Sequence, residues 1–327
     1  MMDRRSALAS FLALAMLPLR GALAQQSARY RIGYLNGGTP KVQSEVLQTM
    51  LLGLKEAGLV RGRDFVLEER WGRGDYDRLP AFADELVALK PDLIITVGSP
   101  ASLAAARATQ TIPVVFINVS NPVDLGIVKS LRQPGRNVTG ISNVGDQVLP
   151  KGLELGMTLV PKATRIGLLT QRDDVSVRQH LKTFDAAAKA RNIRYTVYPV
   201  EHQFDLKRAF DELHQARVEL LIITSQVLFF NSAKELGALS AAAGIPAVSG
   251  FRVITEAGCL ASYGINTPLS HRKAGVYVAK ILAGNNPGEM PVEQATEAEM
   301  VINLKAAKAL GITIPNEMRL RADAIID

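Results

Sequence analysis

Apolar and polar residues alternate along the chain in a pattern that predicts strands and helices in turn. Residues 31–35 and 93–97 are short apolar runs, typical of strands in a parallel sheet that helices cover on both faces. Residues 42–54 instead repeat their apolar positions at helical spacing, and Gly58 follows as a stop signal. This order predicts an α/β fold with a mainly parallel sheet.

The same order of elements returns in the second half of the chain. Three pairs of runs resemble each other at nearly one spacing: 31–35 and 165–169, 93–97 and 221–225, and 112–115 and 245–248. Three matches in one order favour a duplication over a chance likeness between strands. The chain has 327 residues, which is more than one core usually holds. We therefore predict two Rossmann-like lobes with parallel sheets.

The first 24 residues predict a cleavable signal peptide. A charged start at 3–5 precedes an apolar run at 7–17, and residues 22–24 have the small-residue pattern of a cleavage site. The run is too short to span a membrane, which takes about 20 residues. We expect export to the periplasm, by either the general or the twin-arginine route.

Strand candidates at 137–142, 260–264 and 301–303 are expected to carry the chain between the lobes. Three such crossings would form a hinge. The first lobe is predicted to contain residues 29–141, completed by about 265–285 and 304–327. The second lobe is predicted to contain residues 142–264 with about 286–303.

Charge and cysteine content argue against several classes of partner and site. The net charge is +7, but basic residues are interspersed with acidic ones and lack the interleaved aromatic residues of a nucleic-acid surface. We therefore predict no nucleic-acid partner. The single cysteine, Cys259, excludes an intrachain disulfide and a multi-cysteine metal site. We expect no metal and no cofactor.

Sequence motifs of catalysis are absent. The chain has no P-loop, no Gly-x-Ser-x-Gly and no His-Glu-x-x-His. Its four histidines do not fall in a recognisable triad pattern. We predict that the protein is not an enzyme and has no catalytic residues.

Loops at the ends of the predicted strands are the candidate ligand site. Residues 37–40, 98–101 and 118–123 each combine a small or flexible residue, a polar cap and a proline. Such loops expose helix N-termini, whose backbone N–H groups suit a carboxylate. A good helix start would explain any one loop, but three at one sheet edge favour a binding site.

The second lobe offers matching loops at 170–174, 225–226 and 249–252. Phe251 could stack on a ring of the ligand, or it could belong to the core. Arg172 or Arg252 could pair with a ligand carboxylate, or either could be a surface charge.

Several of these segments resemble a known family. The segments that carry the resemblance are residues 97–101, 112–116, 121–123, 135–140 and 301–312. They resemble the ABC transporter substrate-binding family that includes the tryptophan/tyrosine-type binding proteins. The resemblance implies a type 1 periplasmic-binding-protein architecture with three hinge crossovers and closure on a ligand. We expect a monomer whose partner is an ABC transporter permease in the inner membrane.

The resemblance places first-lobe contacts at Asn36, Gly98, Ser99, Ala101, Asn118 and Asn121. The complete predicted ligand-binding set is Asn36, Gly37, Gly98, Ser99, Ala101, Asn118, Asn121, Gln171, Ser225, Gln226, Gly250 and Phe251.

The chain departs from the family pattern in the second lobe. Amino-acid binders of the family share an Asp-Asn pair after the third strand of this lobe, where this chain has Ser225 and Gln226. The usual acidic partner of a ligand amino group is therefore missing there, and Asp173 and Asp174 are the acidic residues that could replace it.

The sequence thus predicts the periplasmic solute-binding component of an ABC-type importer. The expected ligand is a small organic molecule that carries a carboxylate, such as an amino acid or aromatic acid. The alternatives are a sensor that presents its ligand to a receptor and, less favoured, an enzyme on this scaffold.

Overall fold

The structure is a computed structural model that describes residues 29–327. The predicted signal peptide, residues 1–24, lies outside the described residues. Within residues 29–327, no helix has the length and apolar character needed to cross a membrane.

The first lobe is built on a six-stranded sheet with the order β11-β5-β4-β3-β1-β2. All of its strand pairs are parallel. The strands are β1 (Tyr30–Asn36), β2 (Phe65–Trp71), β3 (Leu93–Val97), β4 (Val114–Ser120), β5 (Val138–Asn143) and β11 (Glu293–Ala295).

The second lobe is built on a seven-stranded sheet with the order β13-β12-β10-β9-β8-β6-β7. Its one antiparallel pair joins β10 and β12. The strands are β6 (Ile166–Gln171), β7 (Tyr195–Val200), β8 (Leu220–Ile223), β9 (Ala247–Ser249), β10 (Ala261–Ile265), β12 (Ala298–Asn303) and β13 (Ala324–Ile326). Two mostly parallel sheets confirm the predicted α/β class with two similar lobes.

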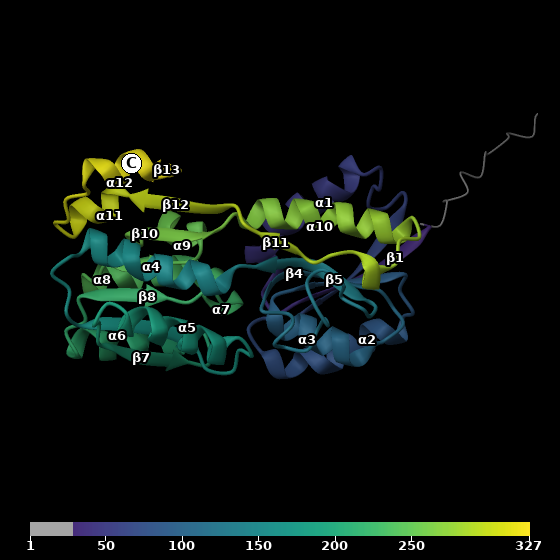
Figure 1. Cartoon of the computed structure of the whole chain (residues 1–327), viewed down its shortest axis with the longest axis horizontal. Coiled ribbons are helices and arrows are strands. Elements are labelled where there is room, and N and C mark those ends of the chain that lie inside the picture. Colours follow the sequence, from purple (N-terminus) through teal and green to yellow (C-terminus); the bar gives the residue numbers. More distant parts are fainter. Residues whose placement is uncertain (1–28) are drawn as a thin grey trace, which may run out of the picture.

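Helices cover both faces of each sheet, and Figure 1 shows the two lobes side by side along the long axis of the molecule. The first lobe carries α1 (Pro40–Glu56) and α10 (Thr267–Leu282) on one face and α2 (Leu79–Ala88) and α3 (Ser99–Ala108) on the other. The second lobe carries α4 (Gly145–Leu159), α5 (Val177–Lys189), α11 (Leu304–Ala309) and α12 (Asn316–Arg321) on one face. Its other face carries α6 (Asp205–Gln215), α8 (Ala233–Ala243) and α9 (Arg252–Glu256), with the short α7 (Val227–Asn231) beside them. Two 3-10 turns, η1 (Tyr76–Arg78) and η2 (Pro287–Glu289), complete the first lobe.

In the described part of the chain, the backbone passes between the lobes at three places. These are the links from β5 to α4, from β10 to α10 and from β11 to β12. Three short links next to one another are the arrangement expected of a hinge.

The tail of the chain corrects one sequence-based expectation. Residues 304–327 were expected on the first lobe, but β13 pairs with β12 in the second sheet. Ala307, Ile314 and Met318 are buried in the core of the second lobe, which explains why the tail lies there.

The segment that precedes the tail needs the opposite correction. Residues 286–303 were expected on the second lobe, but β11 pairs with β5 in the first sheet. The Thr139 hydroxyl also donates a hydrogen bond to the Met290 carbonyl oxygen, at 2.8 Å. Only β12 of this segment belongs to the second sheet.

The α1–α10 contact depends on glycine. A Cβ atom added at Gly53 would lie 2.2 Å from the Arg272 carbonyl oxygen, and one at Gly275 would lie 2.6 Å from the Leu54 backbone nitrogen. The two backbones therefore approach more closely than any other residue type allows.

We expect Gly53→Ala to lower the free energy of unfolding by about 1–3 kcal/mol, because the methyl group must displace backbone. Urea unfolding measures the loss. Gly152 in α4 is the matched control, since a Cβ there would meet its nearest atom at 4.0 Å. Gly152→Ala should be neutral or stabilising, because alanine is the better helix former. Equal effects of the two substitutions would contradict the close contact.

Candidate functional site

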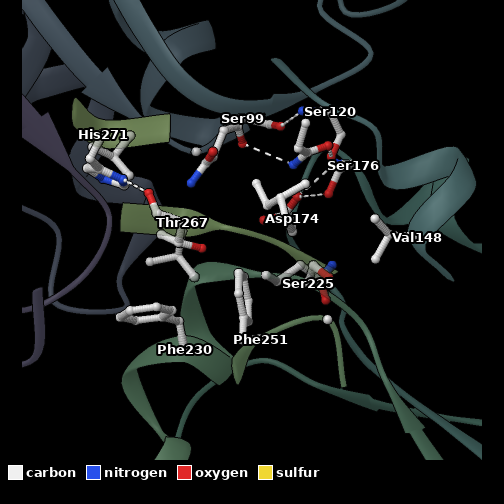
Figure 2. A pocket seen from close by; sticks show the side chains of 18 of the residues that line it. Ser99, Ser120, Val148, Asp174, Ser176, Ser225, Phe230, Phe251, Thr267 and His271 are labelled. Carbon is white, nitrogen blue, oxygen red and sulfur yellow. Dashed lines mark hydrogen bonds between the residues drawn. The ribbon is translucent and has the colours of Figure 1, made fainter. Parts of the chain in front are cut away.

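A pocket of about 50 Å³ lies between the lobes. The ends of β3 and β4 and the start of α3 line it from the first lobe, and loops after β6, β8 and β9 line it from the second. These are the carboxyl ends of parallel strands, where open α/β sheets bind ligands. Figure 2 shows side chains of both lobes around this pocket.

The start of α3 forms one wall. Gly98 takes a φ of 81° at the turn into the helix, and Ser99 begins the helix. The Ser99 hydroxyl oxygen accepts a hydrogen bond from the backbone N–H of Ser120, at 3.2 Å. Both Gly98 and Ser99 line the pocket, so the positive end of a ten-residue helix lies at the site.

A chain of hydrogen bonds joins the carboxyl ends of β4 and β5. The Ser120 hydroxyl donates to the Asn143 side-chain oxygen at 2.8 Å, and the Asn143 amide donates to the Asn118 carbonyl at 3.2 Å. Asn118 has a φ of 58°, which asparagine tolerates better than most residues. Its side-chain oxygen is buried and has no hydrogen-bond partner among the described residues.

The start of α10 is a wall that the sequence analysis missed. The Asn266 side chain accepts a hydrogen bond from the Leu269 N–H at 2.9 Å and caps the helix, and Thr267 and His271 line the pocket. The signal was present, because Asn266 is followed by Thr267 and Pro268, the same cap-then-proline pattern as at the other loops. Nothing in the sequence alone placed this helix beside the cleft.

His271 is a neutral histidine with one unmet acceptor. It is 1% exposed, and burial lowers its pKa to about 4. Its Nδ1 lies 2.9 Å from the Thr267 carbonyl oxygen, which can only accept, so Nδ1 carries the proton and donates (Figure 2). Nε2 is then an acceptor, and it has no partner among the described residues.

Gln226 fixes the second-lobe wall. Its side-chain oxygen accepts hydrogen bonds from the Gln171 backbone N–H, at 2.9 Å, and from the Thr224 hydroxyl. Its amide donates to the Gln171 carbonyl at 3.3 Å. One side chain therefore ties the loop after β6 to the loop after β8, and it also lines the pocket.

Two aromatic rings give the second lobe an apolar surface. Phe230 and Phe251 both line the pocket, with ring centroids 5.3 Å apart and planes at 89°. This edge-to-face pair offers a surface for a ring or an aliphatic group of a ligand. Val148 and Val227 extend the apolar surface.

Asp174 contributes a buried carboxylate. It lies in the turn after β6, is 4% exposed and lines the pocket. Its Oδ1 accepts hydrogen bonds from the Ser176 backbone N–H, at 2.8 Å, and from the Ser176 hydroxyl. Burial raises the pKa of the carboxyl above its usual value, although the Ser176 hydrogen bonds oppose this shift.

The lobes touch each other beside the pocket. The Gln43 amide on α1 donates to the Asn231 side-chain oxygen on α7, at 3.1 Å. Burial and the nearby Asp174 carboxylate on the second lobe raise the pKa of the Tyr76 phenol on the first lobe. The Gln43–Asn231 hydrogen bond therefore joins the two lobes directly.

Seven residues of the predicted set line the pocket: Gly98, Ser99, Asn118, Ser225, Gln226, Gly250 and Phe251. The other five lie outside its lining: Asn36, Gly37, Ala101, Asn121 and Gln171.

Local contacts explain several of these placements. The Asn36 amide donates to the Tyr34 hydroxyl at 2.9 Å, and its side-chain oxygen accepts from the Gly38 N–H at 2.7 Å. Ala101 belongs to α3 and is buried in the core of the first lobe. A Cβ atom at Gly37 would lie 2.8 Å from the Tyr76 ring.

Neither candidate arginine lines the pocket. Arg172 pairs with Glu201 at 2.8 Å, and Arg252 pairs with Glu256 at 2.7 Å. The described residues contain no group of three or more His, Cys, Asp or Glu side chains that could hold a metal ion. Cys259 is buried, and burial raises the pKa of its thiol to about 12, so the thiol stays protonated at neutral pH.

The sequence is similar to a known protein family and to a known protein. Residues 42–326 match the family model described as ABC transporter substrate binding protein. A tyrosine-binding protein of Clostridioides difficile (strain R20291) is 28% identical over 272 residues, which is 83% of this chain and 76% of that protein.

Two solved structures are similar over 91% of this chain. A conserved domain protein from Vibrio cholerae has a TM-score of 0.85 at 25% identity and is covered over 99% of its length. An ABC domain from Streptococcus pneumonia, in complex with L-Trp, has a TM-score of 0.83 at 24% identity and is covered completely, at 100%. These likenesses confirm the type 1 periplasmic-binding-protein fold.

Proposed function

Because this chain belongs to the family of ABC transporter substrate-binding proteins, we propose that it is the exported solute-binding component of an importer. Its ligand is a small organic molecule that binds between the lobes. The observation that carries this proposal is the pocket itself, which both lobes line with polar loop residues at the carboxyl ends of their strands.

The carboxylate of the ligand binds to the first lobe. The first turns of α3 and α10 both line the pocket, and these helices have 10 and 16 residues. Their free backbone N–H groups and partial positive charge suit an anion. Ser99 and Thr267 supply hydroxyl groups at these two helix starts.

Closure of the hinge traps the ligand. Three links join the lobes, and within residues 29–327 the Gln43–Asn231 hydrogen bond bridges the cleft. A ligand that binds the closed form better than the open one shifts the lobes toward closure. The closed form then docks on a membrane permease, in the periplasm to which the predicted signal peptide directs the chain.

A ligand screen followed by small-angle scattering tests the proposal. The screen measures the melting temperature of the purified chain with amino acids, aromatic acids and nucleosides, since a ligand of the folded state raises it. Scattering at saturation should then show a smaller radius of gyration than without ligand. A compound from the same screen that leaves the melting temperature unchanged is the control. Saturated binding without compaction would refute hinge closure, and absence of binding by every class would refute the function.

A further inference from the structure

The short helix α7 lies between the pocket and the first lobe. Its residues Val227 and Phe230 line the pocket, and Leu228 and Phe229 are buried in the core of the second lobe. Asn231 is the last residue of the helix and lies outside the pocket lining. Figure 1 shows α7 at the end of the second lobe that faces the first. One helix is therefore in position to contact both a ligand and the opposite lobe.

Asn231 contacts two elements of the first lobe. Its side-chain oxygen accepts the hydrogen bond from the Gln43 amide of α1, at 3.1 Å. A Cβ atom added at Gly38, in the loop after β1, would lie 2.8 Å from the side-chain nitrogen and oxygen of Asn231 and 3.0 Å from Cγ of Gln43. The Asn231 amide group therefore lies directly against the Gly38 backbone, where a larger residue would displace it.

Buried hydrogen bonds hold the loop that receives Asn231. The Asn36 side-chain oxygen accepts a hydrogen bond from the Gly38 N–H at 2.7 Å, and its amide donates to the Tyr34 hydroxyl at 2.9 Å. Asn36 and Tyr34 are both fully buried. The first lobe therefore presents Gly38 to Asn231 in a fixed position.

The start of α7 also contacts the first lobe. A Cβ atom added at Gly98, in the turn after β3, would lie 3.0 Å from a methyl carbon of Val227. The helix thus meets the first lobe at both of its ends, through Val227 and through Asn231. Because these contacts join two lobes, they exist only while the lobes are together.

We propose that Asn231 is a positioning residue that sets the affinity without touching the ligand, because it forms an interlobe latch with Gln43 and Gly38. This inference rests on the proposed function and deepens it. The latch forms when the lobes come together, so its free energy adds to that of a ligand that binds the closed form. It slows release more than capture, because a ligand enters through the open form and leaves only after the latch has broken.

Binding kinetics of Asn231→Ala test the latch. The probe is the amino acid, aromatic acid or nucleoside that raises the melting temperature most in the ligand screen. The variant loses one hydrogen bond and leaves the Gln43 amide, on a side chain that is 3% exposed, without its acceptor. Stopped-flow measurements should show a dissociation rate roughly fivefold to fiftyfold higher and an unchanged association rate. Asn285→Ala is the matched control, because Asn285 is exposed and lies outside the pocket lining.

Gly38→Ala tests the same contact from the other lobe. Gly38 does not line the pocket, but its new methyl group would meet the Asn231 side chain and keep the lobes apart. The dissociation rate should rise as it does in Asn231→Ala. Asn231→Ala removes the atoms that this methyl group meets, so the double variant should release the probe no faster than Asn231→Ala alone. Gly152→Ala, where a Cβ has its nearest neighbour at 4.0 Å, is the matched control.

Three results would overturn the inference. The first is an unchanged dissociation rate in Asn231→Ala. The second is a double variant in which the two effects add, which would show that Gly38 and Asn231 act separately. The third is an equal change in both rates with a lower melting temperature of the ligand-free Asn231→Ala chain, which would indicate a purely structural role. The probe still binds in all three cases, so the proposed function stands; if no compound binds the unmodified chain, the proposed function fails and the latch fails with it.

Discussion

Replacing Ser99 with aspartate should abolish ligand binding while the chain stays folded. Ser99 is 6% exposed, begins α3 and lines the pocket. A carboxylate at this position occupies the positive helix start that is proposed to hold the ligand's own carboxylate. Two like charges placed next to each other at a binding site cost several kcal/mol of binding free energy. We expect the affinity to fall by more than about a hundredfold, as measured by calorimetry.

Ser99→Asn is the control for this substitution. Asparagine has nearly the size of aspartate, has no charge, and can still accept the hydrogen bond that Ser99 accepts from the Ser120 N–H. The aspartate variant should also fold, because a negative charge at a helix N-terminus is favourable. A folded aspartate variant with unchanged affinity would remove the α3 loop from the site, and equal losses in both variants would indicate a steric effect.

Acidification from pH 6.5 to pH 4 should destabilise the fold through His271. Burial lowers its folded-state pKa from 6.5 to about 4. Between these values the unfolded chain binds a proton that the folded chain does not, so the free energy of unfolding falls as the pH falls. This stabilising contribution is complete above about pH 6.5, and about 3 kcal/mol of it is lost by pH 4.

Urea unfolding at pH 7, 5.5 and 4 measures this effect. The variant His271→Asn removes the titrating ring and should lose less stability than the unmodified chain over this range. Comparison of the two chains separates His271 from carboxyl groups that titrate in the same range. His202 is exposed, and His202→Asn is the control that should leave the pH dependence unchanged. If His271→Asn also leaves it unchanged, the buried neutral imidazole is not its source.

The two sheets and their doubling were predictable because they depend on short-range patterns. Apolar runs such as 93–97 and 221–225 indicate strands that are buried on both faces, and the repetition of these runs indicates a second lobe. The last strands were not predictable in the same way. Both β11 and β13 have three residues, which is too short for a recognisable strand pattern. Their pairing depends instead on which sheet edge the rest of the fold leaves unpaired. The tail was therefore predicted on the first lobe.

The candidate site was predictable where it follows from strand ends. Gly98, Ser99 and Gly250 line the pocket because the carboxyl ends of parallel strands meet at one sheet edge. The contribution of α10 depends instead on how a helix from the far half of the sequence packs on the first lobe. Asn36 also lies at a strand end, but its side-chain amide forms hydrogen bonds with the Tyr34 hydroxyl and the Gly38 N–H, which no sequence pattern reveals.

The position of the tail has one more consequence. The described chain starts with β1 in one sheet and finishes with β13 in the other, and Figure 1 shows these two elements at opposite ends of the molecule. Rotation about the three links therefore changes the span between the two termini. A single end-to-end distance thus reads out the angle between the lobes, which would not hold if both termini belonged to the same rigid body.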